Sequence, residues 1–342
     1  MSKKQVILTG MTPSAGSLTI GNYIGALKPI VELQNASKDK DFYLFVSNLH
    51  ALTNPSVDLR QSDRKNFICT YIASGVDLEK TKLFFQSEVP AHAELSWVLT
   101  CSTTMGELQR MTQYKDKSVR LNKMGNGTDS IPTGLLVYPP LMAADILLYD
   151  SNLVPVGKDQ KQHVELTRNI AQRFNNKYKT NVFVLPDCYI TEDNPEIKDL
   201  QDPSHKMSKS AASAKASIFL NDSAQDVEKK IKVALTDNFN KVKFDVKNQP
   251  AISNLIQIYT CLSGISIKDI EKKYSNISNY GVFKKDLTEV INKFLSTFQA
   301  NYTKATKNWS KIEKILTKNA EDCQKIASKK VDQVYKLIGL RQ

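Results

Sequence analysis

Short apolar runs alternate with helix-like stretches through the first half of the chain, and this alternation limits the folds open to it. The apolar runs are the expected strands, at 6–9, 41–47, 82–86, 152–156 and 182–185. Amphipathic spacing predicts helices between them, such as 23–33 and 161–174. Strands that alternate with helices form a parallel sheet covered on both faces. We therefore expect an α/β fold with a doubly wound, parallel-sheet (Rossmann-like) nucleotide-binding domain.

A turn rich in proline, serine and glycine joins the first expected strand to its helix. Gly16, Gly21 and Gly25 leave room for a ligand and for close packing of the helix on the sheet. The start of a helix also favours a bound anion, because its backbone N–H groups point outward. The stretch matches neither G-x-x-x-x-G-K-[ST] nor G-x-G-x-x-G. On spacing alone, an ordinary strand–loop–helix joint stays open beside a phosphate site.

A second stretch, His205-Lys206-Met207-Ser208-Lys209-Ser210, places two lysines in a loop of small residues. Together the two stretches resemble the nucleotide motifs of class I aminoacyl-tRNA synthetases. Thr19-Ile20-Gly21-Asn22 stands where the family has His-Ile-Gly-His, and this variant resembles the bacterial-type tryptophanyl-tRNA synthetases. The resemblance runs from about Val6 to Leu340, nearly the whole chain.

The resemblance implies that ATP is a substrate, with Mg²⁺ bound mainly through its phosphates. The expected catalytic residues are Thr19, Asn22, Lys117, Lys206 and Lys209, the lysines as positive charge and the other two as neutral donors. The residues expected to bind ATP are Thr12, Pro13, Ser14, Gly21, Asn22, Gly157, Lys158, Asp159, Ile197, Lys206, Met207, Ser208, Lys209 and Ser210. No zinc site is expected, because the five cysteines include no Cys-x-x-Cys pair.

A third stretch, 138–149, is nearly all apolar and contains one carboxylate, Asp145. A buried Asp is costly without a partner, so a solvent-facing or ion-paired Asp145 stays open. An indole N–H is a donor only, and a carboxylate is its natural complement. The resemblance assigns recognition of tryptophan to this side chain. The residues expected to bind tryptophan are Asp145, Gln160, Tyr138, Met142, Ile146 and His50.

Three further expectations concern the two prolines of this stretch and two histidines earlier in the chain. Pro139 and Pro140 are typical of a helix start, so we expect the helix to begin there. His50 follows the second expected strand, where a structural role is as plausible as a place in the site. His92 is expected to be a structural or interface residue without a chemical role.

The apolar periodicity is lost between 187 and 204, where prolines punctuate the sequence, and we expect the domain boundary there. Residues 1–197 would form the catalytic domain, with a connective insertion near 100–140. Residues 198–342 would carry the lysine loop and a helical tRNA- and anticodon-binding domain whose last helix packs back on the catalytic domain. The helices expected there are 226–235, 252–262, 267–273, 282–302 and 312–338.

The net charge of +12 fits a polyanionic partner, although solvated lysines are common. The expected partners are tRNA(Trp), L-tryptophan and ATP, together with a second copy in a homodimer whose interface involves 86–111. No membrane partner is expected, because no apolar run reaches 18 residues. No DNA partner is expected either. The cysteine pattern favours reduced thiols and a cytoplasmic location.

The resulting expectation is a tryptophan–tRNA ligase that forms tryptophanyl-adenylate and transfers the acyl group to tRNA. The nearest alternative is a tyrosyl-tRNA synthetase of the same subclass. A catalytically inactive RNA-binding paralogue and a small nucleotidyltransferase are alternatives from other classes. ATP–pyrophosphate exchange across the twenty amino acids separates them.

Overall fold

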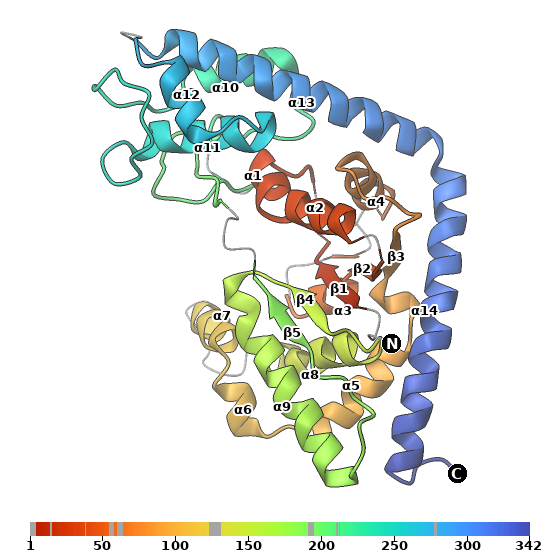
Figure 1. Cartoon of the computed structure of the whole chain (residues 1–342). Helices are drawn as coiled ribbons and strands as arrows, with labels where there is room; N and C mark the ends of the chain where they lie inside the picture. Colours follow the sequence, from red (N-terminus) through yellow and green to blue (C-terminus); the bar gives the residue numbers. More distant parts are fainter. Residues whose placement is uncertain are drawn as a thin grey trace.

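Five parallel strands form the centre of the molecule, in the order β3-β2-β1-β4-β5 (Figure 1). The computed structural model describes residues 5–13, 16–37, 39–54, 58–59, 64–122, 131–190, 195–209, 211, 213–276 and 279–342, with backbone alone at 120, 122 and 158. The strands are β1 (Val6–Met11), β2 (Asp41–Val46), β3 (Thr81–Phe85), β4 (Leu153–Pro155) and β5 (Asp187–Tyr189). The chain runs outward from β1 to β3, then returns to the other side of β1 with β4. This reversal confirms the doubly wound α/β fold and opens a crevice where β1 and β4 end.

The fifth strand lies later in the chain than the sequence predicted. The apolar run at 182–185 is not a strand, because the backbone N–H and C=O of Phe183 bond to the side chain of Asn175 on α9. Phe183 itself is buried in the core. The residues that pair with β4 are Asp187–Tyr189, in the stretch where we expected a connector without regular structure.

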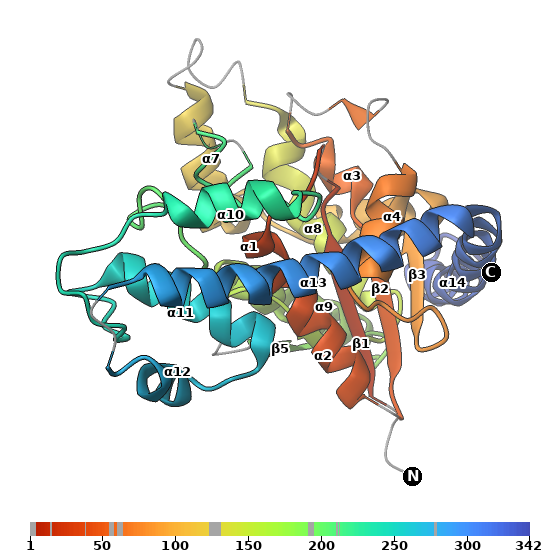
Figure 2. The ribbon, with the colours of Figure 1, turned by 90° about the horizontal axis from the view of Figure 1, so that it is seen from above.

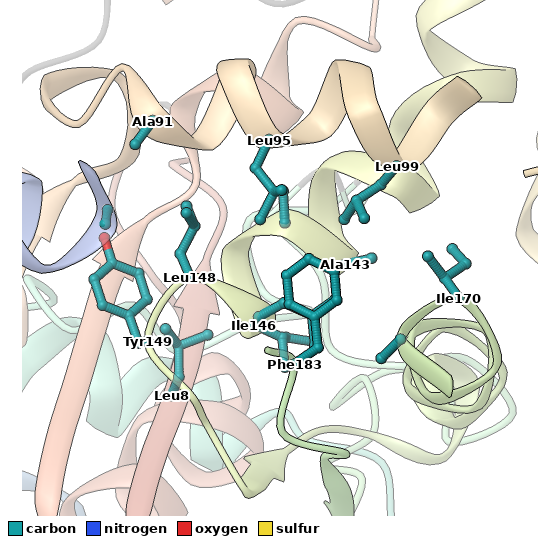
Figure 3. Packing of buried hydrophobic residues seen from close by; sticks show 14 of the residues in the cluster. Leu8, Ala91, Leu95, Leu99, Ala143, Ile146, Leu148, Tyr149, Ile170 and Phe183 are labelled. Carbon is teal, nitrogen blue, oxygen red and sulfur yellow. The ribbon is translucent and has the colours of Figure 1, made fainter. Parts of the chain in front are cut away.

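Helices cover both faces of the sheet. The connections after β1 and β2 supply one layer, which packs on Ile7, Leu44 and Leu83. Its elements are α1 (Ile20–Asn22), η1 (Tyr23–Leu27), α2 (Lys28–Ala36), α3 (Asn48–Ala51) and α4 (Arg64–Ala73). The opposite layer packs on Leu8 and Phe84, as Figure 3 shows around Leu8. Its elements are η3 (Gln86–Glu88), α5 (Ala91–Cys101), α6 (Met105–Gln109), α7 (Thr112–Asn122), α8 (Thr133–Leu147), η5 (Lys158–Gln160) and α9 (Lys161–Tyr178).

Helix α8 begins six residues before the prolines that we expected to start it. It runs from Thr133, and Pro139 and Pro140 lie inside it, both buried. Proline in a helix interior removes a backbone donor, and the packing of α8 against α5 and α9 compensates for it here. The helix therefore carries Tyr138, Met142, Asp145 and Ile146 on consecutive turns, at the spacing of a single helical face.

The remaining helices lie beyond the sheet and then return to it. They are α10 (Ala224–Lys232), α11 (Pro250–Ser263), α12 (Ile267–Lys273), α13 (Gly281–Lys307) and α14 (Trp309–Leu337). Figures 1 and 2 show α13 crossing from the helical cluster to the sheet edge, where α14 descends beside β3. Cys323, Ala327 and Val334 of α14 join the same core as Leu8. In the described part of the chain, no helix is both long and apolar enough to cross a bilayer.

Candidate active site

A cavity of about 1000 Å³ opens where β1, β2 and β4 end. Strand residues such as Leu8, Phe45 and Val154 form its apolar wall, and α8 supplies the opposite side. Gly10 leaves room for the ring of Phe45 on the neighbouring strand, since a Cβ there would lie 2.6 Å from Cζ of Phe45. The cavity therefore lies at the switch point of the sheet, where ligands bind in such folds.

All the residues expected to bind tryptophan lie around this one cavity. Four come from the single face of α8, one from α3 and one from the turn after β4. They are Tyr138, Met142, Asp145, Ile146, His50 and Gln160. The cavity thus combines apolar walls with a few polar groups, which is the usual composition of a small-molecule binding site.

Asp145 is the most enclosed charged group in the cavity wall, with 1% of its surface exposed. Its Oδ1 lies 2.8 Å from Nε2 of Gln86 and 2.6 Å from Nδ1 of His92. Its Oδ2 lies 2.8 Å from Nε2 of His50. Burial by itself would raise the pKa of Asp145, but the bonds from the two histidines hold it below its usual value. Asp145 is therefore an ionised acceptor. It does not face solvent, as one alternative had it, but is buried with partners for both oxygens.

Tyr138 is held in the cavity wall by a histidine behind it. Its hydroxyl lies 2.6 Å from Nε2 of His163 on α9. Burial lowers the pKa of His163 to about 4, and Nδ1 has no hydrogen-bond partner among the described residues. The neutral form of His163 is consequently favoured, so its Nε2 accepts a hydrogen bond from the hydroxyl of Tyr138.

Four of the residues expected on the ATP side also line the cavity: Thr12, Pro13, Gly157 and Lys117. The ammonium group of Lys117, on α7, lies 5.7 Å from the centre of the Tyr138 ring. Asp159 is exposed beside the cavity, where its Oδ2 accepts hydrogen bonds from Gln113 and Gln160. The positive charge of Lys117 and the turn after β4 thus lie at the same cavity as the polar side chains of α8.

A second group of expected ATP residues packs together next to the cavity instead of lining it. Gly21 touches Met207 and Ile197 so closely that a Cβ would lie 3.2 Å from Cβ of Met207. Met207 and Ile197 are both buried, and their backbones are joined by a 2.9 Å hydrogen bond. Glycine at position 21 is what allows the lysine loop to lie against the start of α1.

Thr19 and Asn22 form a capping box at the start of α1. The Thr19 hydroxyl accepts from the Asn22 N–H and donates to its Oδ1, and this oxygen also accepts from the Thr19 N–H. Thr19 is fully buried, whereas Asn22 is half-buried. The Nδ2 group of Asn22 is therefore the donor of this pair that is not used by the capping box.

The lysines of the loop 205–209 differ in their surroundings. Lys206 is exposed, with its ammonium group 4.0 Å from Oε2 of Glu196. Lys209 is partly buried, and this burial lowers its pKa. Ser208 is half-buried, and its carbonyl accepts from the hydroxyl of Ser217. Ser14, Ser210 and the side chain of Lys158, which were also expected to contact ATP, lie outside the described residues.

Sequence reasoning missed the residues behind Asp145. Gln86 was not singled out, and His92 was expected to be structural or at an interface. Both follow the third strand, and the end of a parallel strand at the crevice was the signal that could have found them. Tyr189 of β5, another lining residue, was hidden in the expected connector.

The comparison with protein families decides what kind of protein has this cavity. Residues 2–296 match the model for tRNA synthetases class I (W and Y). The chain belongs to this family. This class I synthetase is 49% identical to the tryptophan–tRNA ligase of Malacoplasma penetrans (strain HF-2), over 98% of both chains.

Two solved structures resemble this synthetase over nearly their whole lengths. The tryptophanyl-tRNA synthetase from Mycoplasma pneumoniae has a TM-score of 0.80 and 34% identity, with 98% of each chain covered. The one from Campylobacter jejuni, complexed with ADP and tryptophan, has a TM-score of 0.78 and 33% identity, with 98% of this chain and all of that chain covered.

Proposed function

We propose that the cavity between β1, β4 and α8 is where this tRNA synthetase binds tryptophan and ATP. The synthetase is a tryptophan–tRNA ligase, which forms tryptophanyl-adenylate and pyrophosphate and then transfers the acyl group to tRNA. The observation that supports this location is the gathering of all six expected tryptophan-binding residues around one cavity. A tyrosyl specificity or an inactive RNA-binding paralogue is not favoured by these relatives.

On the tryptophan side, Asp145 would accept the indole N–H. An ionised carboxylate only accepts and an indole N–H only donates, so the two are matched. Met142 and Ile146 lie on the same face of α8 and would contact the ring. Tyr138 and Gln160 lie nearer the turn after β4 and would orient the polar end of the amino acid, beside the phosphates.

On the ATP side, the chemistry needs charge and positioning instead of a protein base. A carboxylate oxygen of tryptophan attacks the α-phosphorus in line, and pyrophosphate leaves with the electron pair of the broken P–O bond. Lys117, Lys206 and Lys209 would stabilise negative charge on the phosphates as it develops. Asn22 would donate through the Nδ2 group that its capping box leaves available.

The other expected ATP residues would form the nucleotide's surroundings. Thr12 and Pro13 would contact ATP from the end of β1, and Gly157 with Asp159 from the turn after β4. Met207 and Ile197 would lie against the adenine after moving away from Gly21, since their present packing leaves no space there. Mg²⁺ would be held mainly by the phosphates of ATP and would supply further positive charge there.

The division into a catalytic domain at 1–197 and a helical tRNA-binding domain at 198–342 remains our proposal. It is supported by the core that α10–α13 form around Ile252 and Phe283, which is distinct from the core around Leu8 although Ile20 and Ile24 also join it. In residues 301–342, ten Lys and Arg outnumber four Asp and Glu, which suits tRNA. Helix α14 follows α13 in the chain but packs on the cores of the sheet, so it contacts the proposed catalytic part. Because it would supply aminoacylated tRNA for protein synthesis, the protein would act in the cytoplasm.

A homodimer also belongs to this proposal. Trp97 on α5 is 71% exposed and Met105 on α6 is 58% exposed, within the expected interface at 86–111. Large exposed apolar side chains that lie in one region are typical of protein–protein interfaces.

ATP–pyrophosphate exchange measured with each of the twenty amino acids tests the function. We expect exchange with tryptophan alone. Equal or greater exchange with tyrosine at matched concentrations would assign the tyrosyl specificity, and no exchange with any amino acid would favour the inactive paralogue.

A further inference from the structure

The two oxygens of Asp145 face different surroundings. Oδ1 is bonded to Gln86 and His92, which are both fully buried and lie behind the cavity wall. Oδ2 is bonded to His50, which lines the cavity. Oδ2 is therefore the oxygen within reach of a ligand in the cavity, and Oδ1 is the one by which the protein holds the carboxylate.

The proton positions on His92 follow from its two partners. A carboxylate only accepts, so Nδ1 of His92 must carry the proton that it donates to Asp145. In a neutral ring, Nε2 is then an acceptor, and it lies 2.9 Å from the hydroxyl of Tyr149. Burial and nearby groups, including Cys323 and Asp145, hold the pKa of Tyr149 well above its usual value. The hydroxyl therefore stays protonated and donates a hydrogen bond to Nε2 of His92. Tyr149 thereby selects the His92 tautomer that Asp145 requires.

Gln86 is fixed in a comparable way. Its Oε1 accepts the N–H of Leu49 at 3.1 Å, and its Nε2 donates to Asp145. The backbone bond decides which end of the amide faces the carboxylate. Leu49 precedes His50 on α3, so Gln86 connects the helix that carries His50 to the carboxylate that His50 contacts.

Tyr149 is itself held by packing. Its ring stacks on Tyr43 of β2, with 4.9 Å between the ring centres. Figure 3 shows its hydroxyl pointing toward α5, the helix that carries His92, with α14 passing beside it. The position of His92 is therefore set by the core and not by solvent.

We propose that Tyr149, His92 and Gln86 are positioning residues for the selection of tryptophan. They hold Oδ1 of Asp145 so that Oδ2 is aimed at the indole N–H, while His50 is the donor that shares Oδ2 with the ligand. This inference rests on the proposed role of Asp145 and adds the residues through which that role is exerted.

The test compares two substrates that differ in a single donor. 3-(3-Benzothienyl)alanine has nearly the shape of tryptophan but carries sulfur in place of the indole N–H. The ratio of kcat/KM for tryptophan to that for the analogue, measured by pyrophosphate exchange, isolates the N–H···Oδ2 interaction. A merely structural role would lower both values and leave the ratio unchanged.

We expect Tyr149→Phe to lower this ratio about three- to tenfold, chiefly through the KM for tryptophan, because one buried hydrogen bond is lost. His92→Leu should lower it further, because the donor to Oδ1 is gone. His92→Asn should restore most of the ratio, since its amide N–H group can take the place of Nδ1. Tyr43→Phe is the matched control, because it removes a neighbouring hydroxyl outside this chain of bonds, and its ratio should equal that of the parent.

An unchanged ratio in Tyr149→Phe would overturn the proposal, and so would equal losses for both substrates. Tyr149→Phe is the most conservative change, and it decides the matter if His92→Leu fails to fold. Asp145→Asn serves as the reference. If Asp145→Asn lowers the ratio and Tyr149→Phe does not, the positioning role alone is wrong. If Asp145→Asn leaves the ratio unchanged, the proposed role of Asp145 is wrong and this inference falls with it.

Discussion

At the scale of single residues, the site depends on a carboxylate that is stable only because of its partners. Asp145 lies in an apolar helix, where an unpaired charge would be strongly unfavourable. Donors from three other elements reach it: Gln86 from η3, His92 from α5 and His50 from α3. The arrangement of these donors also decides what a substitution at this position does.

Asp145→Asn should impair the use of tryptophan far more than the use of ATP. Gln86 and His92 both donate to Oδ1, so the Asn oxygen must stay on their side and its NH₂ group must face the cavity. The indole N–H then meets a donor, and losing a charge-assisted bond costs about 2–3 kcal/mol, roughly 30- to 150-fold in kcat/KM. The Michaelis constants for tryptophan and ATP, measured beside the parent, check this. If ATP alone suffers, Asp145 has a structural role only.

His163 should make stability depend on pH. Burial lowers its pKa to about 4 in the folded protein, against about 6.5 in an unfolded chain. Between these values the unfolded state binds a proton that the folded state does not, so the stabilisation is complete above pH 6.5 and is lost as the pH falls toward 4. The size of this loss is up to about 3 kcal/mol.

His163→Gln retains an acceptor for Tyr138 but does not titrate in this range. Urea unfolding of parent and variant at pH 7.5, 5.5 and 4.5 measures the difference. We expect the free energy of unfolding to fall less steeply in the variant over this range, and identical slopes would contradict the assignment.

At the scale of elements, one helix and one loop determine the site. Helix α8 presents Tyr138, Met142, Asp145 and Ile146 on one face because its hydrogen bonding continues past two prolines. The loop 205–209 is held against α1 through Met207 and Gly21. The helix provides a wall of the cavity, while in the proposed function the loop would provide charges near the phosphates of ATP.

Lys206→Ala and Lys209→Ala should each slow adenylate formation and leave tryptophan binding nearly intact. Their charge would act on the phosphates as negative charge develops, and removing one such group costs roughly 3–4 kcal/mol, about 10²–10³ in rate. Single-turnover activation and equilibrium tryptophan binding check this. Lys198→Ala is the matched control, since Lys198 pairs with the same Glu196 as Lys206 and should have a small effect. Unchanged activation in both loop variants would refute the role.

At the scale of the whole molecule, α14 joins the far end of the chain to the catalytic core. Lys330, which is nearly buried, bonds to the carbonyl of Val182 at 2.7 Å and pairs with Asp150 at 2.6 Å. Cys323 of the same helix packs in the core that includes Tyr149. Helix α14 and the part of the core that carries Tyr149 are therefore one packed body, and α5 lies next to them.

Trp97→Glu should weaken the proposed homodimer. A carboxylate in place of an exposed Trp would have to be buried without a partner at the interface. We expect the parent to sediment as a dimer at micromolar concentration and Trp97→Glu to shift toward the monomer. Val246→Glu, at another exposed apolar residue, should leave the dimer intact. A parent that sediments as a fully active monomer would exclude the dimer.

The sequence by itself determined the local features. Alternating apolar runs predicted the parallel sheet and four of its five strands, because periodicity reports which side of an element is buried. The resemblance grouped Tyr138, Met142, Asp145 and Ile146, and their helical spacing along α8 brings them to one cavity. The strand predictions held because each depends on residues within a few positions of one another.

Only the tertiary structure decided the pairings between distant segments. The run at 182–185 resembles a strand, but Asn175 of α9 bonds the backbone of Phe183, and Asp187–Tyr189 pairs with β4 instead. In the same way, Gln86 and His92 reach Asp145 across more than fifty positions. A hydrogen bond between such distant residues depends on how the helices pack on the sheet, and no local pattern encodes that packing.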